Sequence, residues 1–198
     1  YEQQLSLFQK LEKEKKNSIF KNNYPVLLFI GRLTKQKKIN QLIEAVKILN
    51  KKANFNLLII GEGEEKLSLE GLAQDLIKEN KCIFYGKSYD EDELSRLIYN
   101  SDLTVSPGNI GLTAIHSLSY GTPVCSHSNL SNQMPEVESI IEGENGFLFN
   151  ENDIQSIVDG IKKWFDEKKS IDKKKIREVV DKFYNPIYQK DVILKSIN

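Results

Sequence analysis

Short apolar runs alternate with amphipathic stretches along most of this chain, and that alternation limits its fold more than any other feature. An unbroken apolar run such as PVLLFIG is typical of a strand covered on both faces. Between such runs, apolar residues recur at helical spacing, as in INQLIEAVKILN. The pattern predicts an α/β fold with a doubly wound, parallel, six-stranded Rossmann-like sheet. We expect its strands within residues 25–31, 55–61, 81–86, 102–107, 122–127 and 146–150.

The two ends of the chain carry further helical patterns. The closing stretch IREVVDKFYNPIYQKDVILKSI predicts two extra C-terminal helices, broken near Pro186. We expect residues 1–22 to form a partly helical interdomain lead-in, and residues 23–198 to form one domain. Within it, Asp90 and Glu93 suggest a capping box at a helix start. The chain opens on Tyr1 rather than methionine, so we expect it to be a piece of a longer protein.

Composition excludes several classes of protein. Lysine plus arginine and aspartate plus glutamate both number 28, and this balance disfavours a nucleic-acid partner. No apolar run is long enough to span a bilayer. Cys82 and Cys125 lie in apolar runs, so we expect buried thiols in a reducing, cytoplasmic setting. With only His116 and His127 present, metal-ligand spacing is absent, and we interpret His127 as structural.

In open parallel sheets, ligands bind beyond the carboxyl ends of the strands. After the first predicted strand, Arg32 and Lys37 lie in a loop that leads into a helix. A forked guanidinium with a nearby ammonium suits an anion that carries several oxygens, such as a diphosphate. After the second strand, GEGEEK lacks the third glycine of a dinucleotide-binding turn. Its three glutamates would also repel a pyrophosphate, so this position disfavours a dinucleotide site.

The stretch SPGNIGLTAIH follows the fourth predicted strand. Gly111 allows a close backbone approach, and the next residues, Leu112 and Thr113, open a helix without acidic residues in its first turn. Free amides at such a start favour an anion. Facing the basic loop, this segment predicts the second half of a diphosphate clamp.

Four blocks, in this order, resemble the group-1 (family 4) glycosyltransferases of GT-B fold. They cover roughly residues 24–165 and match the family's C-terminal, nucleotide-sugar-binding half: FIGRLTKQKKINQLIEAVKIL, LLIIGEGEEKLSLEGLA, IFYGKSYDEDELSRLIYNSDLTVSPGNIGLTAIHSLSYGTPV and MPEVESIIEGENGFLF. The resemblance implies that the N-terminal, acceptor-binding domain is absent from this chain, and that the closing helices cross back onto it. It implies no cofactor and no bound metal, with a UDP- or GDP-sugar as the donor substrate.

The resemblance also implies roles by position. Arg32 and Lys37 correspond to the catalytic pair that holds the donor diphosphate and stabilises the leaving group. The remaining correspondences are to donor-binding positions: the strand end at Gly31, the base-flanking Gly86 and Lys87, the phosphate-binding amides of Gly111, Leu112 and Thr113, and Glu136, for which a helix-start role is an alternative.

The sequence departs from the family at two carboxylates. Two glutamates eight positions apart, one for the donor sugar and one for the ribose, are replaced by Gly108 and His116. His116 could still hydrogen-bond ribose hydroxyls, although a helix histidine without a ligand is the alternative. Asn109 is our candidate for a sugar contact. The pattern is similar to a variant branch among bacterial surface-polysaccharide transferases.

We therefore expect the donor-binding domain of a retaining, hexosyl-type glycosyltransferase with a saccharide or lipid-linked acceptor. The expected location is the cytoplasm or the cytoplasmic face of the membrane, with peripheral membrane association of the full-length protein as part of that expectation. The fragment alone should be inactive. Two alternatives stay open: a catalytically inactive nucleotide-sugar-binding module, and a GT-B-like sugar-nucleotide epimerase.

Overall fold

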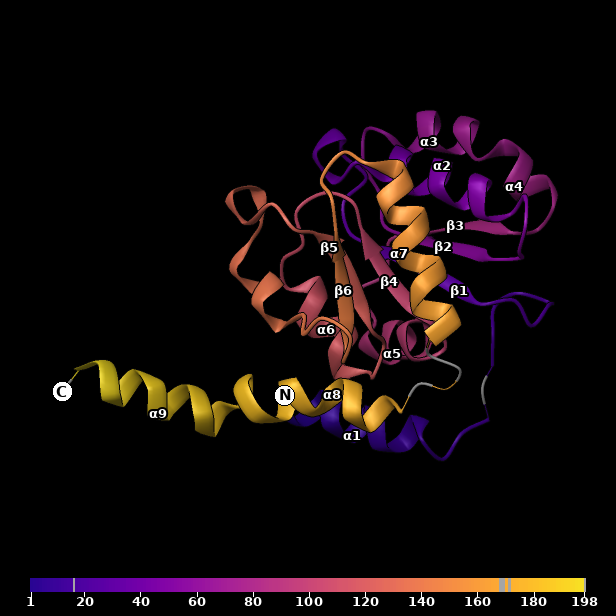
Figure 1. The fold of residues 1–198 in the computed structure, drawn as a ribbon. Coiled ribbons are helices and arrows are strands. Elements are labelled where there is room, and N and C mark those ends of the chain that lie inside the picture. Colours follow the sequence, from indigo (N-terminus) through magenta and orange to yellow (C-terminus); the bar gives the residue numbers. More distant parts are fainter. Residues whose placement is uncertain (16, 168–169, 171, 198) are drawn as a thin grey trace.

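The computed structural model describes residues 1–15, 17–167, 170 and 172–197. Within them, all strand neighbours pair in parallel in one six-stranded sheet of order β3-β2-β1-β4-β5-β6. This confirms the predicted doubly wound sheet (Figure 1). Its strands are β1 (Val26–Ile30), β2 (Asn56–Ile60), β3 (Cys82–Gly86), β4 (Leu103–Ser106), β5 (Val124–His127) and β6 (Gly146–Phe149). Each lies inside the run predicted for it.

Helices cover both faces of this sheet (Figure 1). On one face, the main core forms beneath α2 (Ile39–Leu49), α3 (Lys66–Leu72), α4 (Gln74–Lys78) and α7 (Ile154–Glu167). The other face carries α1 (Glu2–Leu11), α5 (Glu91–Tyr99), α6 (Thr113–Ser119) and α8 (Lys173–Phe183). Among the described residues, the connections contain the short 3-10 turns η1 (Lys35–Lys37), η2 (Leu130–Asn132) and η3 (Pro135–Ser139).

The two C-terminal helices are confirmed as α8 and α9 (Pro186–Ile197), with the break next to Pro186. Helix α8 buries Ile176, Val179 and Val180 against α6, whereas α9 extends away from the body of the domain (Figure 1). Proline has no amide hydrogen to donate, so it is tolerated at the first position of the new helix.

The start of α5 is only partly as predicted. Asp90 caps the helix, because its side chain accepts hydrogen bonds from the amides of Asp92 and Glu93 at 2.9 and 3.3 Å. The Glu93 carboxylate does not reach back to Asp90. It accepts instead from the hydroxyls of Tyr85, at 2.5 Å, and Ser88. The reciprocal half of the capping box was therefore wrong, because two nearby hydroxyls compete for the carboxylate.

Cys82 and Cys125 are buried and unpaired, as predicted. Burial raises the pKa of the Cys82 thiol to about 12, so both side chains act as small apolar residues. In the described residues, no helix combines the length and apolar character that a membrane crossing requires. The same residues contain no group of three or more His, Cys, Asp and Glu side chains placed to hold a metal ion.

Candidate active site

The chain leaves β1 through a contact between two glycine backbones. A Cβ built on Gly61 would lie 1.9 Å from the carbonyl oxygen of Gly31, and Gly61 has a φ of +148°. Only glycine fits that position. The contact lets the segment after β1 cross the end of β2, where the Leu33 amide donates to the Glu62 carbonyl at 3.0 Å. This crossing places Arg32 and the lysines of η1 at the carboxyl edge of the sheet.

A third glycine, Gly108, joins that basic segment to the end of β4. The amide of Gly108 donates to the carbonyl of Lys37 at 3.1 Å. A Cβ on Gly108 would lie 2.2 Å from the Gln36 carbonyl oxygen and 2.7 Å from the Lys37 Cα. Both are backbone atoms, which cannot move aside as a flexible side chain can. Gly108 is therefore required by the packing of η1, and a glutamate is incompatible with this arrangement.

Lys37 and Asn109, both predicted site residues, are in direct contact. The Lys37 ammonium donates to the Asn109 carbonyl oxygen at 2.7 Å and to its side-chain Oδ1 at 2.9 Å. Burial lowers the pKa of Lys37. Two neutral acceptors fix the position of this cation without neutralising its charge. Arg32, by contrast, is exposed, and its guanidinium makes no hydrogen bond or ion pair within the described part of the chain.

The turn into α6 carries unused amides. Gly111 and Leu112 accept helical hydrogen bonds through their carbonyls, from Ala114 at 2.8 Å and His116 at 2.9 Å. Among the described residues, no group accepts from the amides of Gly111, Leu112 or Thr113. The first turn of α6 contains no acidic residue. The Thr113 hydroxyl donates to the Ile30 carbonyl at 3.4 Å, so these amides lie beside the end of β1.

His116 already has a carboxylate partner that sequence reasoning missed. Its Nε2 lies 2.9 Å from Oε1 of Glu91, which also accepts from the Tyr120 hydroxyl at 2.5 Å. The rings of His116 and Tyr120 pack edge to face. Burial, with help from Glu91, raises the pKa of Tyr120 well above its ordinary value. In the sequence, this partner was indicated only by the acidic run at residues 90–93, and acidic residues are equally typical of the first turn of a helix.

The structure brings some of the other predicted residues together and leaves one apart. Glu136, in η3, lies against Gly111: its Oε2 would be 3.9 Å from a Cβ there, and this buried oxygen has no hydrogen-bond partner. Lys87 follows β3 and is exposed, with its ammonium 6.0 Å from the centre of the Tyr89 ring. These contacts connect the segments after β1 and β4 with η3, whereas Lys87 contacts Tyr89 in its own loop.

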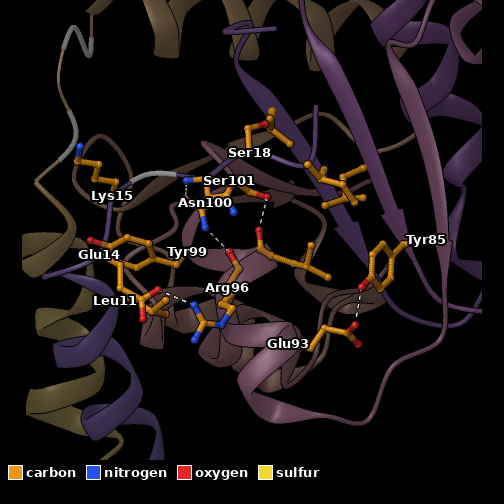
Figure 2. A pocket seen from close by; sticks show the side chains of 15 residues that line it. Leu11, Glu14, Lys15, Ser18, Tyr85, Glu93, Arg96, Tyr99, Asn100 and Ser101 are labelled. Carbon is orange, nitrogen blue, oxygen red and sulfur yellow. Dashed lines mark hydrogen bonds and ion pairs between the residues drawn. The ribbon is translucent and has the colours of Figure 1, made fainter. Parts of the chain in front are cut away.

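A cavity of about 670 Å³ lies elsewhere, between the residues after α1, helix α5 and the sheet (Figure 2). Its lining includes Val26, where β1 begins, and Ser101, which precedes β4. Arg96 pairs with Glu14 at 2.5 Å in this cavity, and the Glu93 carboxylate accepts from the Tyr85 hydroxyl (Figure 2). None of the predicted site residues lines it, so this cavity is separate from the candidate site at the carboxyl edge of the sheet.

Comparison with known proteins agrees with this architecture. The family model described as "Glycosyl transferases group 1" matches residues 10–180. An uncharacterized glycosyltransferase of Haemophilus influenzae is 30% identical over 151 residues, which are 74% of this chain and 41% of that protein. The chain thus spans less than half the length of this curated relative.

Solved structures share the fold at lower identity. The C-terminal domain of the group 1 protein LpcC from Francisella tularensis superposes with a TM-score of 0.69 at 21% identity, covering 94% of this chain and 95% of that domain. Anabaena HepE, solved in complex with UDP, gives a TM-score of 0.68 at 20% identity, covering 100% of this chain and 54% of that one. The extent of the family match and the shared GT-B-type fold show that the chain belongs to the group 1 glycosyl transferases, as a C-terminal domain.

Proposed function

We propose that this chain is the donor-binding domain of a retaining glycosyltransferase. The full-length protein would transfer a hexosyl group from a UDP- or GDP-sugar to a saccharide or lipid-linked acceptor. The observation that carries the proposal is the fixed Lys37 ammonium, held on Asn109 next to the turn that contains the free amides of Gly111, Leu112 and Thr113. The UDP bound by the structurally similar HepE supports the nucleotide class.

The proposed chemistry follows from where negative charge develops. When the bond between the anomeric carbon and the phosphate oxygen breaks, the nucleotide diphosphate leaves with increased negative charge. Fixed cations and amides stabilise that charge without having to reorganise. Lys37 supplies a positioned point charge, and the unpaired Arg32 supplies a guanidinium that can hold two phosphate oxygens. No bound metal is part of this proposal.

The nucleoside would lie beside α6, which carries His116. We assign the ribose hydroxyls to the His116–Glu91 pair, because a carboxylate and an imidazole together offer both donors and acceptors. Lys87 and Gly86 would flank the base. Glu136 would act indirectly, by setting the position of the Gly111 turn that it contacts.

Calorimetric titration of the chain with UDP, GDP and ADP tests the proposal. One nucleotide should bind saturably, and Arg32→Ala should weaken it about 10- to 150-fold, because each charge-assisted bond contributes roughly 1.5–3 kcal/mol. Lys52→Ala is the matched control, since Lys52 is an exposed cation in the turn before β2. An Arg32→Ala affinity within about twofold of the parent chain would overturn the diphosphate assignment.

A second candidate, a catalytically inactive nucleotide-sugar-binding module, is favoured by one observation. The packing of η1 leaves no room for a carboxylate at Gly108. Product analysis with the full-length protein separates the two: sugar transfer to an acceptor supports the enzyme, and nucleotide binding without transfer or hydrolysis supports the module.

A further inference from the structure

A polar cavity of about 430 Å³ lies next to the Lys37–Asn109 contact. Of the residues that line it, Asn109 is the one for which the sequence predicted a ligand contact. Its walls come from η1, from the segment after β4, from the end of β5, from η2, and from Glu151 after β6. Its volume falls in the range of small-molecule sites. The lining residues are Gln36, Lys38, Asn109, His127, Ser131, Asn132, Gln133 and Glu151.

The lining contains neutral hydrogen-bonding groups that have no protein partner among the described residues. These are the side-chain amide of Gln36, the Nδ2 of Asn109, the hydroxyl of Ser131 and the Oδ1 of Asn132. The His127 ring is 1% exposed, and its buried Nδ1 also lacks a partner. Gln36, Ser131 and Asn132 are exposed and remain available to a ligand, whereas a buried nitrogen such as Nδ1 of His127 is normally satisfied. The wall therefore offers both donors and acceptors of hydrogen bonds.

The charges in this wall cancel. The Glu151 carboxylate lies 2.6 Å from the Lys38 ammonium, and it also accepts from the side-chain amides of Asn129 and Asn132. These contacts lower the pKa of Glu151 to about 2, so the ion pair persists at neutral pH. Burial lowers the pKa of His127, which keeps that ring uncharged. A wall without net charge favours a neutral, hydroxyl-rich ligand over a phosphate or a cation.

Asn109 connects the cavity to the proposed phosphate site. The backbone carbonyl and Oδ1 of Asn109 accept hydrogen bonds from Lys37, and Asn109 also lines the cavity. In a nucleotide sugar, the ring is bonded directly to the terminal phosphate, so the ring must occupy space that adjoins the phosphate site.

We infer that this cavity binds the neutral sugar ring of the nucleotide-sugar donor, with Asn109 and Asn132 as specificity-determining residues and Glu151 positioning Asn132. The inference rests on the proposed donor function. It assigns the sugar contacts to Asn109, to the η2 segment and to the segment after β6.

Calorimetry with pairs of ligands tests this assignment on the 198-residue chain. The panel is UDP with UDP-glucose, UDP-galactose, UDP-N-acetylglucosamine and UDP-glucuronate, and GDP with GDP-mannose. At least one neutral sugar nucleotide should bind more tightly than its parent nucleotide. UDP-glucuronate should show no such gain, because its sugar carries a carboxylate. Asn132→Ala should reduce the gain about 2- to 10-fold, the effect of one lost hydrogen bond, while UDP affinity stays constant.

Asn129→Ala is the matched control. Asn129 also donates to Glu151, at 2.6 Å, but it does not line the cavity, so this variant should keep the sugar gain. Thermal unfolding of each variant checks that it is folded. Nucleotide binding with no gain for any sugar, or equal losses in both asparagine variants, would overturn the inference alone. Failure of every nucleotide to bind would overturn the proposed function and the inference with it.

Discussion

At the scale of single residues, Gly108 shows how a local departure from a family pattern is tied to its surroundings. The sequence shows only that a carboxylate is missing at this position. The structure adds the reason, which is that the backbone of Gln36 and Lys37 occupies the space a side chain would need. The same contact holds η1 where Lys37 reaches Asn109. The missing carboxylate at Gly108 and the position of the Lys37 ammonium therefore have one structural cause.

Gly108→Ala should therefore lower the free energy of unfolding by about 1–3 kcal/mol and weaken nucleotide binding, because the new Cβ would push η1 and Lys37 away. Urea unfolding and calorimetry measure the two effects. Gly71→Ala is the control: a Cβ there meets no atom within 4 Å, and alanine in a helix should stabilise by roughly 0.5–1 kcal/mol. Equal stability of the two variants would contradict the packing argument.

At the scale of elements, one ion pair joins three connections at the carboxyl edge. Lys38 ends η1 in the left-handed conformation, with φ of 52°, and its side chain reaches Glu151 after β6. The Glu151 carboxylate in turn holds Asn132 at the end of η2. Since the Glu151 side chain is only 13% exposed, solvent screens this contact less than it screens a surface pair.

This pair gives stability a definite pH dependence. The pKa of Glu151 falls from 4.5 to about 2 on folding, so its contribution is complete above pH 4.5 and is lost as the pH falls towards 2. The stability difference between the parent chain and Glu151→Gln should shrink across that window. Urea unfolding at several pH values measures it. A difference that stays constant from neutral pH to pH 3 would show that the carboxylate charge does not stabilise the fold.

At the scale of the whole molecule, the N-terminal segment is part of the packed body. Phe8 and Leu11 of α1 are each 3% exposed, and they belong to the core between α5 and the sheet. Arg177 of α8 is buried beside them, with its guanidinium 5.3 Å from the centre of the Phe8 ring, and it donates to the Ser119 carbonyl. Helices from the two ends of the chain thus complete one layer (Figure 1).

Phe8→Ala should lower the free energy of unfolding by about 3–5 kcal/mol, because it leaves a cavity where α1 meets the sheet layer. Leu67→Ala, at a side chain that is 84% exposed, should change it by less than about 0.5 kcal/mol. Chemical denaturation of both variants measures the difference. Equal values would mean that α1 acts as a passive linker and contributes no packing energy.

The sequence by itself determined the sheet, the two C-terminal helices and the edge at which the candidate site lies. Apolar periodicity is a local property, and glycines at strand ends mark turns, so strands such as β1 and the break near Pro186 could be predicted from short windows. The candidate clamp at Arg32, Lys37 and residues 111–113 could also be predicted, from the residues that come directly after the first and fourth strands.

Only the tertiary structure decided which groups meet. Lys37 with Asn109 and Glu91 with His116 are separated by 72 and 25 positions, and Lys38 with Glu151 by 113. Contacts at such separations depend on the order of strands and on backbone packing at Gly108, which local pattern does not encode. For that reason the carboxylate beside His116 and the neutral cavity beside Asn109 appeared only when the sheet brought their loops to one edge.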